Sequence, residues 1–174
     1  MGYTLKDNHD TNNNLLSGIL NTAWAAMTFT ASDSYTITKV SLLIYRAATA
    51  PANVVASIRA TTAGVPSGAD LCEGSVVGST LTTNSAGTWI EFDLGVGTAL
   101  TSGVKYSVCL RPDENIGIYW RVDTASGYAN GNMCTDNASG TSWTTRTYDG
   151  AFRTYSISAG GVFVPHYYQK LLAG

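Results

Sequence analysis

At 174 residues, the chain is long enough for a single domain with a sizeable hydrophobic core. Its net charge is −2 and its ten lysines and arginines are scattered singly, so no nucleic-acid partner is expected. Charged residues make up 13% of the sequence, about half of the roughly 25% that is usual in soluble domains. This low share favours a protein that uses much of its surface in contacts.

No apolar stretch approaches the roughly 18 residues that a membrane-spanning helix requires, so no membrane partner is expected. The N-terminus is not typical of a secretion signal, because polar residues follow Lys6 where an apolar segment is required. We therefore expect synthesis in the cytoplasm. Cys72, Cys109 and Cys134 match no disulfide framework or C-x-x-C motif. Three buried or half-buried thiols are expected, with one disulfide as the alternative.

Residues 1–22 are expected to form an N-terminal arm outside the main domain. Apolar side chains at helical spacing allow a short helix here, with Asn13 or Asn14 as its cap, although Gly18 disfavours it. These apolar residues are Leu16, Ile19, Leu20, Ala23 and Met27. Within the arm, the expected contacts with other subunits are Leu15, Leu16, Ile19 and Leu20.

Residues 23–157 are typical of one all-β domain. Short segments with apolar side chains at every second position alternate with clusters of Gly, Pro, Asn and Ser. The predicted strands are 35–45, 54–60, 75–81, 88–94, 105–110, 116–122, 132–135, 142–145 and 151–157. Since no convincing long helix accompanies them, the sequence predicts a jelly-roll-like antiparallel β-sandwich of about eight strands.

Residues 158–174 are expected to form a C-terminal arm that begins at Gly160–Gly161. Five of the seven residues in Val162–Tyr168 are aromatic or β-branched, and such a segment is costly to leave in water. The segment could add as a strand to the sheet edge of a neighbouring subunit, or it could fold back on its own domain. The leading candidates for contacts between subunits are Val162, Phe163, Val164, Tyr167 and Tyr168.

The sequence offers no convincing catalytic or metal-binding constellation. The two histidines, His9 and His166, lie one in each arm, away from any nucleophile that a hydrolase would need. Ser102 and Lys105 match the spacing of some acyl-transfer enzymes, but they lie at a turn before a strand. A calcium-loop pattern that starts at Asp10 lacks its required Gly and Glu. We therefore expect a non-enzymatic protein with no cofactor and no metal.

Aromatic and charged side chains on two predicted strands form a candidate ligand-binding surface. Trp89, Glu91 and Asp93 share one face of their strand, and Tyr119 and Arg121 share one face of theirs. An aromatic ring beside charged groups can hold a sugar, and two carboxylates on one face could also serve a glycosidase. The alternatives are a solvated outer face for the carboxylates and packing against loops or another subunit for the aromatics. Loop aromatics that could add to this surface are Tyr128 and Trp143.

Several stretches between residues 27 and 155 share a pattern of turns and core aromatics. They include Gly64–Leu71 (GVPSGADL), Gly87–Leu94 (GTWIEFDL), Leu100–Val108 (LTSGVKYSV) and the pair Ser142–Trp143. Together these stretches resemble a recurrent β-sandwich module of phage structural proteins and of bacterial surface and extracellular proteins. The resemblance omits both arms and implies a fold, with no shared catalytic residues to carry over.

The expected function is a virion structural protein, such as a phage capsid decoration or a head/tail accessory subunit. Its expected partners are copies of itself and other virion proteins, bound through the terminal arms. The alternative is a carbohydrate- or receptor-binding module on a viral or cell surface, with a glycan as its ligand. A subunit of an extracellular filament is a third option, which would need an export route.

Overall fold

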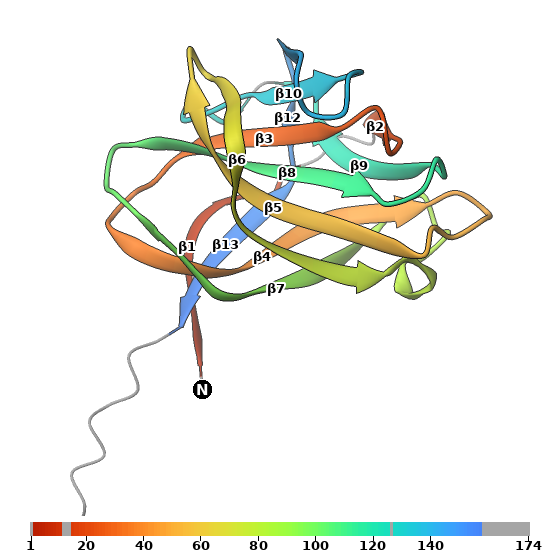
Figure 1. The fold of residues 1–174 in the computed structure, drawn as a ribbon, viewed down its shortest axis with the longest axis horizontal. Helices are drawn as coiled ribbons and strands as arrows, with labels where there is room; N and C mark the ends of the chain where they lie inside the picture. Colours follow the sequence, from red (N-terminus) through yellow and green to blue (C-terminus); the bar gives the residue numbers. More distant parts are fainter. Residues whose placement is uncertain (1, 12–14, 126, 158–174) are drawn as a thin grey trace, which may run out of the picture.

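The computed structural model describes residues 2–11, 15–125 and 127–157, which form an all-β fold of two antiparallel sheets (Figure 1). The seven-stranded sheet contains β1 (Tyr3–His9), β2 (Leu15–Ile19), β4 (Tyr35–Arg46), β7 (Thr88–Leu100), β9 (Ile118–Asp123), β12 (Asp149–Gly150) and β13 (Phe152–Ile157). The six-stranded sheet contains β3 (Ala25–Thr30), β5 (Asn53–Thr62), β6 (Val65–Val77), β8 (Lys105–Pro112), β10 (Met133–Asp136) and β11 (Trp143–Thr145). One 3₁₀ turn, η1 (Gly78–Thr80), follows β6.

The order of the six-stranded sheet is β11-β10-β3-β8-β5-β6. In the other sheet the order is β1-β13-β4-β9-β12, with β2 also paired to β9 and β7 to β4. Strand β4 is central, because β7 pairs along one of its edges while β13 and β9 share the other. Among the described residues, no helix is long and apolar enough to cross a membrane.

The hydrophobic core lies between the two sheets. Its largest fully buried side chains include Phe29 from the six-stranded sheet and Phe92, Trp120 and Phe152 from the seven-stranded sheet. The rings of Phe29 and Phe152 pack with centroids 5.7 Å apart. Trp120 Nε1 donates to the carbonyl oxygen of Ala151 at 2.8 Å, so the buried indole also satisfies its polar atom.

The sequence correctly predicts an all-β class with two packed sheets, but the described residues contain thirteen strands instead of about eight. Strand β6 begins at Val65, ten residues before the predicted start, because a turn at Ala63 and Gly64 with positive φ closes a hairpin with β5. The three cysteines are free, with Cys72 half-buried and Cys109 and Cys134 buried.

The largest departure from the sequence-based expectation concerns residues 1–22. The expected arm instead contributes β1, which pairs with β13, and β2, which pairs with β9. The helical spacing that extends to Met27 falls partly on β3, a strand whose residues are buried on both faces. A short apolar run of this kind cannot be told from a buried helix by periodicity alone.

Candidate assembly edge and ligand-binding faces

Strand β1 ends the seven-stranded sheet with an apolar corner. In the antiparallel pairing of β1 with β13, Tyr3 lies opposite Ile157 and Leu5 lies opposite Tyr155, so each pair shares one face of the sheet. Lys39 Nζ lies 3.8 Å from the ring centroid of Tyr3 and 4.7 Å from that of Tyr155 on this face. We call the four side chains on β1 and β13 the Tyr3 corner.

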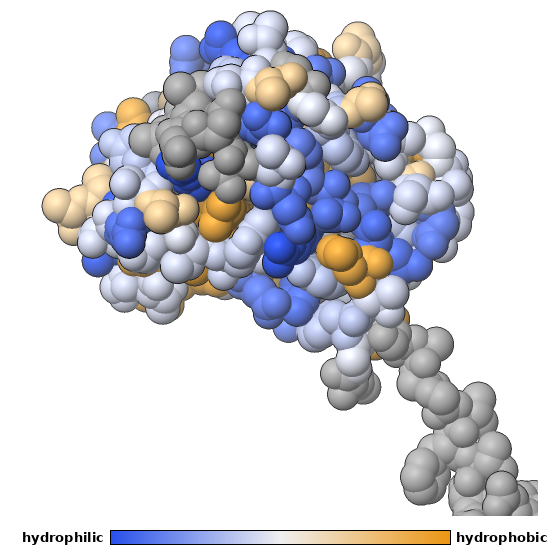
Figure 2. Space-filling view, turned by 180° about the vertical axis from the view of Figure 1, so that it is seen from behind, coloured by the Kyte–Doolittle hydropathy of each residue, from blue (hydrophilic) through white to orange (hydrophobic). Residues whose placement is uncertain are grey.

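The Tyr3 corner is strongly exposed. Tyr3, Leu5 and Ile157 keep 44%, 46% and 43% of their surface accessible. Figure 2 shows an orange apolar patch close to where the described chain ends, on a face that is otherwise mostly blue and white. In the described part of the chain, β1 pairs only with β13, so its outer edge has no strand partner. An apolar edge of this kind is a template for pairing with another chain.

The middle of β1 is fixed to the domain by a buried network around Asp7. Tyr35 Oη donates to Asp7 Oδ2 at 2.8 Å, and the Ser32 backbone N–H donates to Asp7 Oδ1 at 3.1 Å. The Asp7 backbone N–H donates to Thr154 Oγ1 at 2.9 Å. Burial is the main cause that raises the pKa of Tyr35 far above its ordinary value, so its hydroxyl remains a donor. These bonds make β1 an integral strand.

The residues predicted to contact other subunits have different fates. Ile19 is 1% exposed and packs in the core of its own domain, so it is not available for another subunit. Leu20 is 37% exposed. The backbones of Leu15 and Leu16 pair with β9. The C-terminal candidates all lie outside the described residues; they are Val162, Phe163, Val164, Tyr167 and Tyr168.

The predicted alternation along β7 is confirmed by the structure. Phe92 and Leu94 are buried in the core, while Glu91 and Asp93 are exposed on the outer face. Trp89, on the same face, is half-buried because the guanidinium carbon of Arg153 lies 3.9 Å from the centroid of its ring. The three predicted β7 residues therefore share one face.

Arg153 and Lys39 form ion pairs on this face. Arg153 donates to both carboxylate oxygens of Asp10, at 2.8 and 3.0 Å, so its guanidinium is held over the Trp89 ring. Lys39 Nζ donates to Glu91 Oε1 at 2.9 Å. Of the β7 residues predicted to bind a ligand, Trp89 and Glu91 are therefore already engaged within the domain.

Tyr119 and Arg121 lie on the outer face of β9, as their parity predicts. Tyr119 stacks on Tyr45 of β4, with ring centroids 4.8 Å apart and an angle of 15° between the planes. Arg121 is buried on this face and not open to a ligand, because only 4% of its surface is accessible. Arg121 Nη1 donates to the carbonyl oxygen of Ser85 at 3.1 Å, so the loop before β7 covers the guanidinium.

A hollow of about 260 Å³ lies beside Tyr119. Its lining residues are Gly18, Ile19, Leu20, Ala23, Gly117 and Tyr119. Gly18 lies directly opposite Tyr119 in the β2–β9 pair, and a Cβ at this position would lie 3.6 Å from the ring carbon Cε1. Since pockets for drug-sized ligands begin at roughly 300 Å³, this hollow suits a single small ring or one side chain.

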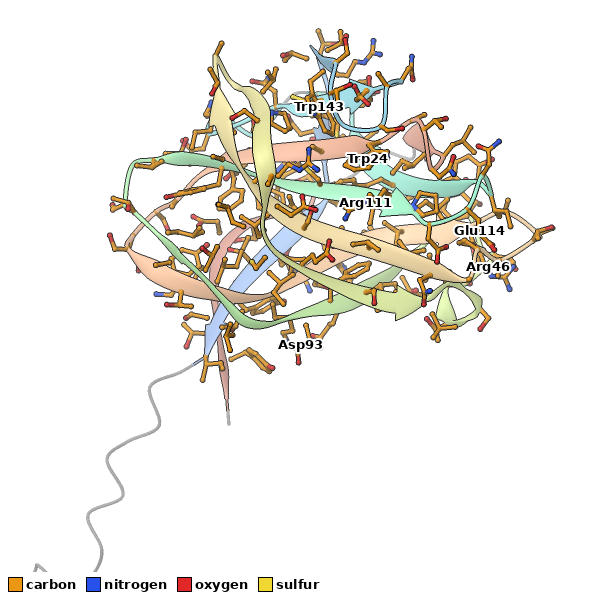
Figure 3. The ribbon with its side chains drawn as sticks, viewed as in Figure 1. Trp24, Arg46, Asp93, Arg111, Glu114 and Trp143 are labelled. Atoms are coloured by element: carbon orange, nitrogen blue, oxygen red, sulfur yellow. The ribbon has the colours of Figure 1, made fainter. Side chains whose placement is uncertain are left out.

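A cluster that the sequence patterns did not predict lies on the outer face of the six-stranded sheet. The guanidinium carbons of Arg59 and Arg111 lie 5.0 and 4.6 Å from the centroid of the Trp24 ring. Both arginines bind Asp70, at 2.6 Å from Arg59 Nε and 3.0 Å from Arg111 Nη2. Trp143, Trp24 and Arg111 follow one another across this face in Figure 3.

Asp70 is the shared acceptor of this cluster. Burial alone would raise the pKa of its carboxyl, but hydrogen bonds from Arg59 and Ser57 and the charge of Arg111 hold the pKa below its ordinary value. Arg59 has outward parity on the predicted strand 54–60, whereas Arg111 lies just beyond the predicted strand 105–110. Asp70, in contrast, was assigned to a loop, so its position beside them could not be predicted.

A rigid loop between β10 and β11 covers the same face. The carboxylate of Asp136 accepts the backbone N–H groups of Ala138, Gly140 and Ser142. Gly140 has φ of +84°, and a Cβ there would come within 2.5 Å of the Trp24 ring. The loop therefore packs tightly on the cluster, and Arg59 Nη1 donates to the Gly140 carbonyl at 3.2 Å.

A buried polar niche lies at the far end of β1. His9, which was expected in an arm outside the domain, places Nε2 3.7 Å from Asp123 Oδ2, and both side chains are buried. The Tyr128 backbone N–H donates to Asp149 Oδ2 at 3.0 Å. Burial is the main cause that raises the pKa of Asp149. In the described segments, no group of three or more His, Cys, Asp or Glu side chains could hold a metal ion.

Neither the protein-family models nor the curated proteins compared with this sequence gave a match. Function is therefore inferred from the geometry of the edge, the hollow and the two outer faces.

Proposed function

We propose that the protein is a non-enzymatic structural subunit of a virion, such as a phage capsid decoration or a head/tail accessory subunit. In this proposal the sandwich, taken as jelly-roll-like, is a rigid body, and the C-terminal segment connects it to copies of itself and to other virion proteins. One observation carries the proposal: the apolar Tyr3 corner is exposed beside an unpaired strand edge, where the described chain ends at Ile157.

Physical chemistry favours contact at this corner. Exposed apolar side chains at a sheet edge stabilise association, because covering them removes apolar surface from water at roughly 25 cal/mol per Å². The segment that follows contains Val162–Tyr168, in which most residues suit a β-strand. The acceptor surface therefore lies beside Ile157, and in the sequence the segment rich in β-forming residues begins five positions later.

Two sequence properties support the assignment to a virion. Charged residues are only 13% of the chain, as in a protein that uses much of its surface in contacts. The stretches between residues 27 and 155 resemble a module of phage structural proteins, an argument by analogy of fold.

The test is the native mass of the full-length chain beside the same chain without Gly161–Gly174. We expect a defined assembly for the full-length chain and a monomer for the shortened chain. A full-length chain that stays monomeric up to millimolar concentration would contradict assembly through this segment.

The hollow beside Tyr119 favours a second candidate, a carbohydrate-binding module. Sugar rings stack on aromatic faces, and glycines at Gly18 and Gly117 leave room beside this ring. Titration with a panel of glycans, followed by NMR, tests this candidate. Tyr119→Ala should abolish binding, whereas Tyr3→Ala, on the same sheet but at its far corner, should leave binding intact. Equal loss in both variants would exclude the hollow.

A further inference from the structure

The open part of the β1 edge is restricted to its first half. The pairing of β1 with β13 is regular from Tyr3 to Leu5 and then shifts at a bulge before Asn8. A bulge and an inward-pointing charge both discourage strand addition, and buried Asp7 lies within this bulge. Lys6 is bound to its own domain, with Nζ 2.9 Å from Asp33 Oδ2. Only the Tyr3–Leu5 stretch therefore lacks these protections.

The segment after β13, Val162–Tyr168, has a composition that suits an added strand. Within Val162–Tyr168, Pro165 is the one residue without a backbone N–H. Pro is tolerated on an edge strand when its nitrogen faces away from the ladder. If the Pro165 nitrogen faces away from β1, the backbone N–H groups of Val164 and His166 face the acceptor edge. The outward Pro then discourages a further strand. Addition to each sheet would then end after one strand.

Strand direction decides between the molecule's own segment and that of a neighbour. Only four residues separate Ile157 from Val162, so these two residues can lie about 17 Å apart when the chain is extended. Because Ile157 lies opposite Tyr3, a segment from the same molecule reaches the outer edge of β1 most directly at Tyr3, and from there it runs parallel to β1. A neighbour's segment can run antiparallel, which is the more stable pairing and the one adopted by every described strand pair.

We infer that the Tyr3–Leu5 edge of β1 binds residues 162–168 of a second copy of this chain as an added antiparallel strand. The inference rests on the proposed function and names the acceptor site and the partner. Side chains of the added strand would lie beside Tyr3 and Leu5 and cover the Tyr3 corner. The partner's segment would thereby form main-chain hydrogen bonds along this edge.

The chain offers a closely matched control for the acceptor site. Leu5 and Leu71 are both leucines with 46% of their surface exposed, and each lies on a strand at the end of its sheet. The experiment compares Leu5→Lys, Leu71→Lys and Val164→Lys in the full-length chain, with mass measured by light scattering over a concentration series. We expect Leu5→Lys and Val164→Lys each to weaken self-association at least tenfold, and Leu71→Lys to change it less than twofold.

The outcomes separate this inference from the proposed function. Assembly that survives Leu5→Lys but not Val164→Lys would overturn the β1 acceptor while leaving assembly through the C-terminal segment intact. A wild-type monomer at all concentrations would overturn both. Hydrogen exchange would then compare the wild-type monomer with Val164→Lys. If the molecule's own segment pairs parallel to β1, the β1 amides lose protection in the variant. Far-ultraviolet circular dichroism verifies that Leu5→Lys is folded, and Tyr3→Lys provides an independent second disruption of the same edge.

Discussion

Two strands lie at the ends of their sheets, β6 and β1, and they differ in how far the rest of the fold covers them. Strand β6 packs against β7 of the opposite sheet, and the backbones approach so closely that a Cβ at Gly74 would lie 2.0 Å from the Asp93 carbonyl oxygen. Strand β1 has no such cover along Tyr3–Leu5 in the described structure. The sandwich is therefore closed along one side and open at one corner.

The two outer faces repeat this contrast. On the six-stranded sheet, Trp24 lies under two arginines that share Asp70, and the Asp136 loop packs over the cluster. On the seven-stranded sheet, the corner at Tyr3 and Leu5 stays exposed. An exposed apolar group at the end of a sheet is informative because the rest of the molecule shows how such ends are covered.

The largest effect is expected when the closed side is broken. Gly74→Ala should lower the free energy of unfolding by about 3 kcal/mol, because the added methyl group meets backbone that cannot move aside. Thermal unfolding measures this loss. The matched control is Gly18→Ala, where the new Cβ would be in ordinary contact with Tyr119 at 3.6 Å. Equal melting temperatures for the two variants would contradict close packing between β6 and β7.

A smaller effect is expected when the anchor of β1 is removed. Tyr35→Phe deletes the hydroxyl that donates to buried Asp7, which should lower the free energy of unfolding by about 2 kcal/mol. Urea unfolding gives this value. Tyr3→Phe, at the exposed corner, should change stability by less than about 0.5 kcal/mol. If Tyr35→Phe is equally harmless, the Asp7 network does not hold the strand.

The far end of β1 predicts a pH dependence. Burial raises the pKa of Asp149 in the folded state, so the folded state binds this proton more tightly than the unfolded state does. The associated stability is fully present below the unfolded pKa and is lost as pH rises through the folded pKa. Unfolding measured from pH 4 to 7 should therefore show wild type losing stability relative to Asp149→Asn. Parallel curves for the two proteins would contradict this assignment.

The smallest effect concerns the buried thiols of the six-stranded sheet and tests whether solvent reaches them. Burial raises the pKa of Cys109 to about 12, and the pKa of Cys134 to about 11. Both lie in a small cluster against which Val65 and Trp143 pack. Alkylation at pH 8 should be at least tenfold slower in the native protein than in urea. In the native protein the two thiols form little thiolate, and the reagent cannot reach them. Rapid native alkylation would show that this face opens.

The alternation of apolar and polar residues correctly predicted which face of a strand each side chain occupies. Phe92 and Leu94 face the core, and Glu91 and Asp93 face out, because side chains alternate along any strand. The burial of Arg121 could not be predicted, since the loop that covers it comes from residues near Ser85, far away in the sequence. Parity fixes the face of a strand, but it does not show what folds over that face.

The place of the N-terminal strand could not be predicted for the same reason. Asp7 is bonded to Thr154, 147 residues away, and neither residue carries a local signal for the other. Likewise, the Trp24 cluster depends on Asp70 from β6, which the sequence pattern assigned to a loop. Contacts between distant segments decide both, and no short-range pattern encodes them.

Hydrogen exchange at β1 tests the central claim most directly. The amides to follow are those of Tyr3–Leu5 that do not bond to β13, measured in the full-length chain at low and high concentration. We predict that their protection rises with concentration in step with native mass, while β4 amides stay protected throughout. Rapid exchange of these edge amides in a fully assembled sample would contradict the claim that β1 is the site of assembly.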